Sequence, residues 1–149
     1  MAECKNIMVY VETAEGNPVK VGLEMLSPAK KLADKVTAVV IGGGVADAAK
    51  EVAKAGADQV ICVDSEDYKE FNLDAYAQVL VELVKEENPE AVFVGGTQDG
   101  KDIAPVVAAK CNTGCASDVL DIKAEDGEVI YTCPVSYTHL RAHETELHL

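Results

Sequence analysis

Positively charged side chains are scarce in this sequence. Its 149 residues contain 13 Lys and Arg against 26 Asp and Glu, which gives a formal net charge of −13. A nucleic acid needs cationic side chains to neutralise its phosphates, and an anionic membrane surface attracts the same groups. The charge balance therefore argues against a nucleic acid partner and against binding to an anionic membrane.

Long apolar runs are absent as well. No stretch reaches the ~18 residues of a membrane-spanning helix, and the first residues lack the basic and apolar regions of a signal peptide. We expect a cytoplasmic protein without membrane insertion. The cysteines are odd in number and form no CxxC pair, which suits reduced, mostly packed thiols better than a disulfide framework. They are Cys4, Cys62, Cys111, Cys115 and Cys133.

Apolar residues make up 48% of the chain, enough to bury the core of one domain. Four short apolar runs predict strands, at residues 7–12, 36–41, 59–63 and 91–94. Each is followed by an amphipathic stretch that predicts a helix. Strands alternating with helices predict an α/β fold, a Rossmann-like parallel sheet with helices on both faces. Asp126-Gly127 then predicts a closing β-hairpin, and the fold is expected to be incomplete at its C-terminus.

Some helix ends follow from single residues, and prolines leave others open. Asn72 is predicted to cap the third helix. Pro28 either kinks one helix or opens a second helix behind Ser27 as its N-cap. Pro105 fits if the fourth helix begins near Asp102, where the missing N–H belongs to the first turn.

The composition changes abruptly at residue 136. Residues 1–135 contain 12 Lys but no Arg and no His, whereas the last 14 residues hold the only Arg and all three His. Residues 135–145 can be back-translated into a string that resembles the adapter of transposase-based sequencing libraries, read in frame. We therefore predict a truncated α/β domain over 1–135 and an appended tail over 136–149. The same argument disfavours a zinc site built from Cys133, His139, His143 and His148.

Two Gly-rich segments could approach a phosphate or a nucleotide. Residues 42–44, Gly-Gly-Gly, follow a strand but lack the dinucleotide fingerprint spacing, which favours a tight turn. Residues 95–100, Gly-Gly-Thr-Gln-Asp-Gly, follow the fourth strand. In a strand order of 3-2-1-4-5 the crevice opens between strands 1 and 4, so a ligand there would meet this segment. The residues concerned are Gly95, Gly96, Thr97 and Gln98; a plain turn capped by Asp99 or Asp102 is the simpler interpretation.

No catalytic constellation is visible in residues 1–135. They contain no Ser-His-Asp, Cys-His or paired-carboxylate arrangement, which disfavours an enzyme that uses its own side chains. Cys111 and Cys115 flank a Gly turn without a second pair, which favours packed cysteines over metal or redox chemistry. The acidic run 64–70 favours a solvated loop, with weak metal binding as the alternative.

Several blocks together resemble the N-terminal domain of the electron transfer flavoprotein alpha subunit. They are residues 7–13, the helix containing 23–34, and Gly-Ala-Asp at 56–58. The most diagnostic block is 94–118, VGGTQDGKDIAPVVAAKCNTGCASD, which is similar to the family's pattern of strand, Gly-[GA]-Thr, Gly-[RK]-Asp, Ala-Pro, Ala-Ala and Thr-Gly. Lys101 stands where the family commonly has Arg, which keeps the charge but loses the planar fork. The resemblance covers about residues 5–135.

The resemblance implies a heterodimeric, FAD-containing electron carrier that accepts electrons from acyl-CoA or related dehydrogenases. Its partner would be the electron transfer flavoprotein beta subunit. The FAD would be held mainly by a C-terminal domain absent from this chain, so no FAD is expected here. The arguments above from the residues already lead us to expect no metal and no catalytic residue. Gly95, Gly96, Thr97 and Gln98 would supply secondary contacts only, to a flavin or adenine nucleotide held chiefly by the partner.

On this interpretation the chain is a structural and subunit-docking domain. The alternative from another class is a stand-alone adenine-nucleotide-binding or stress-protein-like α/β domain. A third possibility is a purely structural subunit whose crevice is empty.

Overall fold

The computed structural model describes the backbone of residues 4–112, 115–116, 121–125, 128–132, 139–142 and 146–148. Its centre is a sheet with the strand order β5-β4-β1-β6-β11-β7. The four strands predicted from apolar runs are β1 Cys4–Tyr10, β4 Ala33–Gly42, β5 Gln59–Asp64 and β6 Ala91–Val94. They pair in parallel, in the order third, second, first, fourth. The Rossmann-like parallel sheet is therefore confirmed.

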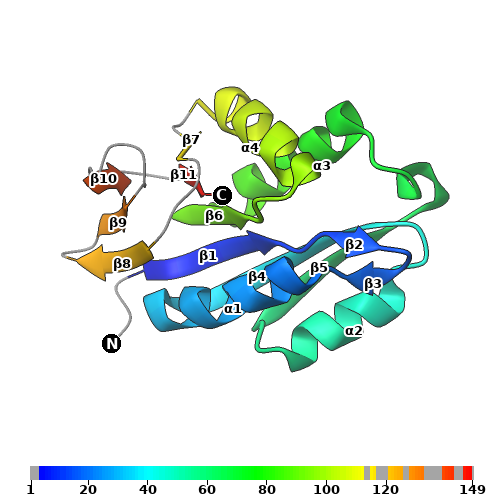
Figure 1. Ribbon diagram of the computed structural model, residues 1–149, viewed down its shortest axis with the longest axis horizontal. Helices are drawn as coiled ribbons and strands as arrows, with labels where there is room; N and C mark the ends of the chain where they lie inside the picture. The colour runs from blue at the N-terminus through cyan, green and yellow to red at the C-terminus, as the bar shows by residue number, and fades with distance from the viewer. Residues whose placement is uncertain are drawn as a thin grey trace.

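Helices cover both faces of this sheet (Figure 1). α1 Lys20–Leu32 and α2 Ala46–Lys54 pack on one face. α3 Leu73–Glu87 and α4 Gln98–Lys110 pack on the other. The arrangement is the one that right-handed crossovers between parallel strands produce.

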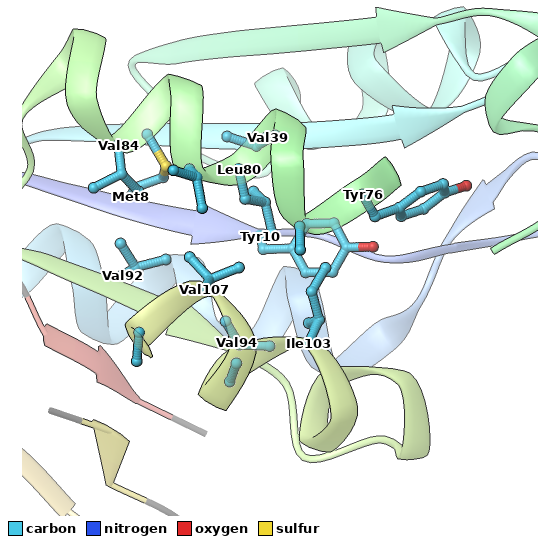
Figure 2. Packing of buried hydrophobic residues seen from close by; sticks show 14 of the residues in the cluster. Met8, Tyr10, Val39, Tyr76, Leu80, Val84, Val92, Val94, Ile103 and Val107 are labelled. Atoms are coloured by element: carbon cyan, nitrogen blue, oxygen red, sulfur yellow. The ribbon is translucent and has the colours of Figure 1, made fainter. Parts of the chain in front are cut away.

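Strand β1 shows how one apolar run serves both layers. Ile7 and Val9 belong to the core beneath α1 and α2, whereas Met8 and Tyr10 belong to the core beneath α3 and α4. None of the four is more than 2% exposed. Successive side chains of a strand point to opposite faces, so a strand covered twice must be apolar at every position. Figure 2 shows the second core, in which Tyr10 lies among side chains from the sheet, α3 and α4.

Pro28 and Pro105, the two prolines whose effect on the helices was open, both lie inside helices. α1 continues through Pro28 as one helix, so of the two alternatives the second helix behind Ser27 is wrong. α4 begins at Gln98 rather than near Asp102, so that prediction is also wrong. A proline removes one helical N–H and normally costs about 3 kcal/mol. In α4, burial of one face of the helix offsets this cost. The buried residues are Ile103, Ala104, Val107 and Ala108.

The remaining predicted boundaries are close to those found. Asn72 caps α3, because its Oδ1 accepts a hydrogen bond of 3.0 Å from the backbone N–H of Ala75. Gly56 follows Ala55, the C-cap of α2, and has a φ of +123°, which glycine adopts more readily than other residues. The predicted hairpin is present as β8 Asp121–Glu125 paired antiparallel with β9 Glu128–Thr132.

The other short elements lie at the ends of the sheet. β2 Thr13–Ala14 and β3 Asn17–Pro18 form a small hairpin after β1, and η1 Glu66–Tyr68 follows β5. Two strands come from the predicted tail: β10 His139–Ala142 pairs with β9, and β11 Glu146–His148 lies between β6 and β7 Cys115–Ala116. The boundary at residue 135 stays a prediction. Among the described helices, none combines the length and apolarity needed to cross a bilayer.

Candidate functional site

The candidate site lies where the sheet reverses its strand order. β1 pairs with β4 on one side and with β6 on the other, so the chain leaves the ends of β1 and β6 toward opposite faces. In open parallel sheets this switch point opens a crevice at the carboxyl ends of the strands. Here the crevice is bordered by the residues after Tyr10 and by the segment after Val94.

A chain of hydrogen bonds joins the two borders of the crevice. The Thr97 hydroxyl donates to the Glu12 carboxylate and accepts a hydrogen bond of 3.1 Å from the backbone N–H of Gly100. Thr97 is the N-cap of α4, so the cap expected at Asp99 or Asp102 is wrong. A Cβ on Gly100 would lie 1.9 Å from the carbonyl oxygen of Gly95, so only glycine fits there. The end of β1 is thereby fixed to the start of α4.

The four predicted contact residues are neighbours, but only two face outward. Gly95 is buried, and a Cβ there would lie 2.8 Å from Cγ1 of Val21. The Thr97 side chain is used by the helix cap. Gly96 and Gln98 are exposed, and a Cβ on Gly96 would meet no atom within 4 Å. The packing of α1 therefore explains why residue 95 is a glycine. No contact inside the described chain requires a glycine at residue 96.

A cavity of about 360 Å³ lies beside this segment. It extends over the carboxyl ends of β1 and β4 and is bordered by Lys69 and Phe71 of the loop after η1, by α3 and by the first turn of α4. The sequence predicted the crevice but not the polar side chains in it; the signal for them was Glu12, a carboxylate two residues after the buried apolar run of β1. The polar side chains in its wall are those of Tyr10, Glu12, Thr13, Glu15, Lys69, Tyr76 and Asp99.

Burial dominates the electrostatics of the cavity. It raises the pKa of the Tyr10 hydroxyl well above its ordinary value, and Glu12, Tyr76 and Asp99 raise it further. Burial also raises the pKa of Glu12, against the hydrogen bond from Thr97. Tyr76 has a raised pKa for the same first reason, and its hydroxyl donates to the carbonyl oxygen of Tyr68. Tyr10 thus stays protonated at neutral pH.

The Gly-Gly-Gly segment is a turn whose anion position is already filled. The backbone N–H of Gly44 donates a hydrogen bond of 2.7 Å to the Asp64 carboxylate. Gly44 has a φ of +70°, and a Cβ on Gly42 would lie 2.7 Å from Cγ1 of Val45. Backbone turns of this kind bind phosphate when their N–H groups are free. With Asp64 in that place, the tight turn is the correct interpretation.

The described side chains do not fit a metal or the diphosphate of FAD. No group of three or more His, Cys, Asp or Glu among them is arranged to hold a metal ion. Glu12 and Asp99 lie beside the start of α4, where they would repel a diphosphate, and Thr97 already accepts from the N–H of Gly100. The side chains of Cys133 and of the three histidines lie outside the described residues.

The described cysteines differ from the expectation of packed thiols. Cys62 and Cys115 are exposed and Cys111 is half-buried, and no disulfide joins these three. Cys62 is exposed because it lies on β5, which forms one edge of the sheet. Partial desolvation of the Cys62 thiol, followed by the nearby Asp64 carboxylate, raises its pKa, and burial raises the pKa of Cys111, so neither is an activated thiolate.

Comparison with known proteins decides the family. A family model described as "Electron transfer flavoprotein domain" matches residues 7–147. This chain belongs to the electron transfer flavoprotein family. The match continues past residue 135 and therefore does not place the boundary predicted there.

Similar electron transfer proteins are named as subunits of complexes. The electron transfer flavoprotein subunit alpha of Clostridium acetobutylicum is 37% identical over 139 residues, 89% of this chain and 41% of that subunit. The same subunit of Syntrophomonas wolfei is 40% identical over 124 residues, 83% of this chain and 39% of that subunit. The acryloyl-CoA reductase electron transfer subunit beta of Anaerotignum propionicum is 38% identical over 118 residues, 76% of this chain and 32% of that subunit.

The matched part is the N-terminal portion of the alpha subunits. The chain therefore spans between about a third and two fifths of the length of these electron transfer flavoprotein relatives. The resemblance to the N-terminal domain of the alpha subunit is confirmed, whereas a stand-alone adenine-nucleotide-binding domain has no support.

Proposed function

We propose that this chain is the structural and subunit-docking part of an electron transfer flavoprotein alpha subunit, working in the cytoplasm. The observation that carries the proposal is the family match over residues 7–147, together with relatives named as alpha subunits. Packing explains Gly95 and the cap of α4 explains Gly100, whereas the exposed Gly96 is left for a contact outside this chain, which supports a docking role. The whole protein would carry electrons as a partner of a beta subunit.

The electron donors in this proposal are acyl-CoA or related dehydrogenases. One relative is named as an electron transfer subunit of acryloyl-CoA reductase, which supports a dehydrogenase-linked complex. FAD, when bound, supplies the redox chemistry, and a protein contributes position and electrostatics. In this proposal the FAD is held mainly by a part of the alpha subunit that this chain does not contain.

The contribution of this chain is the exposed edge formed by Gly96 and Gln98. Because a Cβ on Gly96 would meet nothing within the described chain, the backbone there is open to close approach by another molecule. We expect this edge to lie near the beta subunit and to give secondary hydrogen bonds to a flavin or adenine nucleotide that the partner holds. Gly95 packs against Val21, and the Thr97 hydroxyl donates to the Glu12 carboxylate. These two contacts hold the backbone of Gly96 and Gln98 in position.

Gly96→Val in the full-length alpha subunit, co-expressed with the beta subunit, tests the docking edge. The branched side chain fits within this chain but blocks close approach from outside, so heterodimer yield and flavin content should fall. Ala55→Val is the matched control, because Ala55 is exposed at the end of α2 on the opposite face of the sheet. Unchanged assembly, flavin absorbance and electron-transfer rate in Gly96→Val would show that this segment is only a turn.

The placement of the flavin has a separate test. This chain purified alone should show no flavin absorbance, whereas the full-length alpha and beta subunits purified together should be yellow. Near-stoichiometric flavin on the isolated chain would contradict the proposed placement, and a colourless full-length pair would contradict the proposed electron carrier.

A further inference from the structure

The cavity over β1 and β4 contains a buried polar group that the docking role does not use. Tyr10 is 2% exposed, and its ring lies in the core between the sheet, α3 and α4. Its side chain also forms part of the cavity wall. In Figure 2 its hydroxyl points away from Met8 and Val92, toward the side where the hydroxyl of Tyr76 lies.

The Tyr10 hydroxyl has no hydrogen-bond partner in the part of the chain that the structure describes. Tyr76, its neighbour, differs in this respect because its hydroxyl donates to the carbonyl oxygen of Tyr68. Buried polar groups are almost always paired, since leaving one unpaired loses its hydrogen bonds to water without replacement. A partner for Tyr10 must therefore come from the cavity.

The charges around the cavity select the kind of partner. Three carboxylates, those of Glu12, Glu15 and Asp99, face one ammonium group, that of Lys69. Asp99 makes no side-chain hydrogen bond to any described residue, whereas the Glu12 carboxylate accepts from the Thr97 hydroxyl and is also stabilised by the backbone N–H of Gly100. The cavity therefore offers hydrogen-bond acceptors and negative charge, which repel an anion and attract a cation.

The walls also supply apolar surface beside the charges. Phe71 and Tyr76 pack edge to face with ring centroids 5.0 Å apart, and both line the cavity together with Ile41. Methylene groups bury well against such surface, and an ammonium group is attracted to aromatic rings. A metal ion would gain nothing from these walls.

We propose that this cavity binds a small aliphatic amine. Its ammonium group lies between the carboxylates of Glu12 and Asp99 and donates one N–H to the Tyr10 hydroxyl oxygen, and its methylenes lie against Phe71 and Tyr76. Glu15 and Lys69 stand at the exposed rim and admit the ligand. This inference does not rest on the docking role, because the cavity lies within one chain.

Calorimetric titration of the full chain with putrescine, at about 0.15 M salt to screen distant charges, tests the proposal. Putrescine should bind with one-to-one stoichiometry. Butane-1,4-diol has the same length without the charge and should not bind, and Mg²⁺ at equal concentration should not compete. Absence of putrescine binding, equal binding of the diol, or full competition by Mg²⁺ would each overturn the proposal.

Two variants locate the ligand. Tyr10→Phe removes the unpaired hydroxyl, so it should raise the putrescine Kd about threefold to tenfold while leaving the Tm of the free protein unchanged or higher. Asp99→Asn should raise the Kd about threefold or more. Asp47→Asn is the matched control, because Asp47 is also an acidic residue in the first turn of a helix but lies outside the cavity.

Other results would assign Tyr10 and Asp99 different roles. A lower Tm for Tyr10→Phe with an unchanged Kd would make the hydroxyl structural. Equal effects of Asp47→Asn and Asp99→Asn would mean that putrescine responds to net charge alone. As a measurement on the unchanged protein, backbone amide shifts on adding putrescine should saturate around Tyr10, Lys69 and Asp99; saturating shifts elsewhere would contradict the proposed site.

Discussion

Thr97 is the residue on which the geometry of the crevice depends. Its hydroxyl hydrogen goes to Glu12 and its oxygen accepts from Gly100, so one side chain caps α4 and holds the end of β1. The cap leaves no room for a side chain at residue 100, where a Cβ would lie 1.9 Å from the carbonyl oxygen of Gly95. The exposed Gly96 is under no such restriction.

Gly100→Ala should therefore destabilise the domain by about 1–3 kcal/mol, the usual cost of forcing atoms into a filled space. Gly96→Ala is the matched control and should change the free energy of unfolding by less than about 0.5 kcal/mol, because its Cβ meets no neighbour. Urea denaturation of both variants measures the difference. Equal stability of the two would mean that the start of α4 is not packed against Gly95 as described.

Glu12 should make stability depend on pH. Burial raises the pKa of its carboxyl above the ordinary value of 4.5, although the hydrogen bond from Thr97 opposes the shift. Because the folded state binds this proton more tightly than the unfolded state, the contribution of Glu12 is complete below pH 4.5. It falls as the pH rises through the pKa of the folded state.

Glu12→Gln should remove that dependence. The amide oxygen can still accept from Thr97, and nothing ionises. The difference in unfolding free energy between the two proteins should change in favour of Glu12→Gln as the pH rises above 4.5. Denaturation curves at a series of pH values give this difference directly. A difference that is constant with pH would show that the Glu12 pKa is the same in the folded and unfolded states.

At the scale of elements, the sequence predicted well wherever burial alone decides the structure. β6 was predicted over its whole length because a strand covered on both faces is apolar at each position. The start of α4 was missed because Pro105 suggested a later beginning, whereas the cap at Thr97 and a buried apolar face keep the first turns helical. Local propensity yields to tertiary packing in such cases.

The cavity could not be predicted from the sequence for a related reason. Tyr10 and Asp99 are 89 positions apart along the chain, and only the pairing of β1 with β6 brings them to one wall. The strand order predicted a crevice at this point, but not which side chains line it. The spacing of Gly-Gly-Gly gave no sign that Asp64 would fill its anion position.

The N-cap of α3 offers a test at this scale. Asn72→Ala removes the side-chain oxygen that accepts from Ala75, so it should lower the free energy of unfolding by about 1 kcal/mol. Ser65→Ala is the control, because Ser65 makes the same kind of bond, at 3.3 Å, to a helix of only three residues. Its effect should be less than half as large. Equal losses, measured by thermal denaturation, would mean that α3 gains nothing from its cap.

At the scale of the whole molecule, two apolar layers enclose a sheet whose carboxyl edge is acidic. The core on each face is continuous from β1 to its two helices, which fixes the sheet independently of any ligand. The net charge of −13 and the three carboxylates in the cavity wall both make the electrostatic potential negative at this edge of the sheet. Electrostatics therefore favour a cationic or uncharged partner at this edge, and any anionic cofactor needs positive charge from another chain or domain.

Residues 136–149 are predicted to add little to this molecule. β11 lies between β6 and β7 in the sheet, yet its sequence is Glu146-Leu147-His148, whereas a central parallel strand is normally apolar throughout. A chain ending at residue 135 should therefore have a Tm within about 2 °C of the 149-residue chain, a difference that corresponds to less than about 1 kcal/mol. Neither chain should bind zinc tightly, because the HxxxH histidines belong to the predicted tail. A large loss of stability on truncation, or stoichiometric zinc binding abolished by replacing His139 and His143, would make these residues an integral part of the domain.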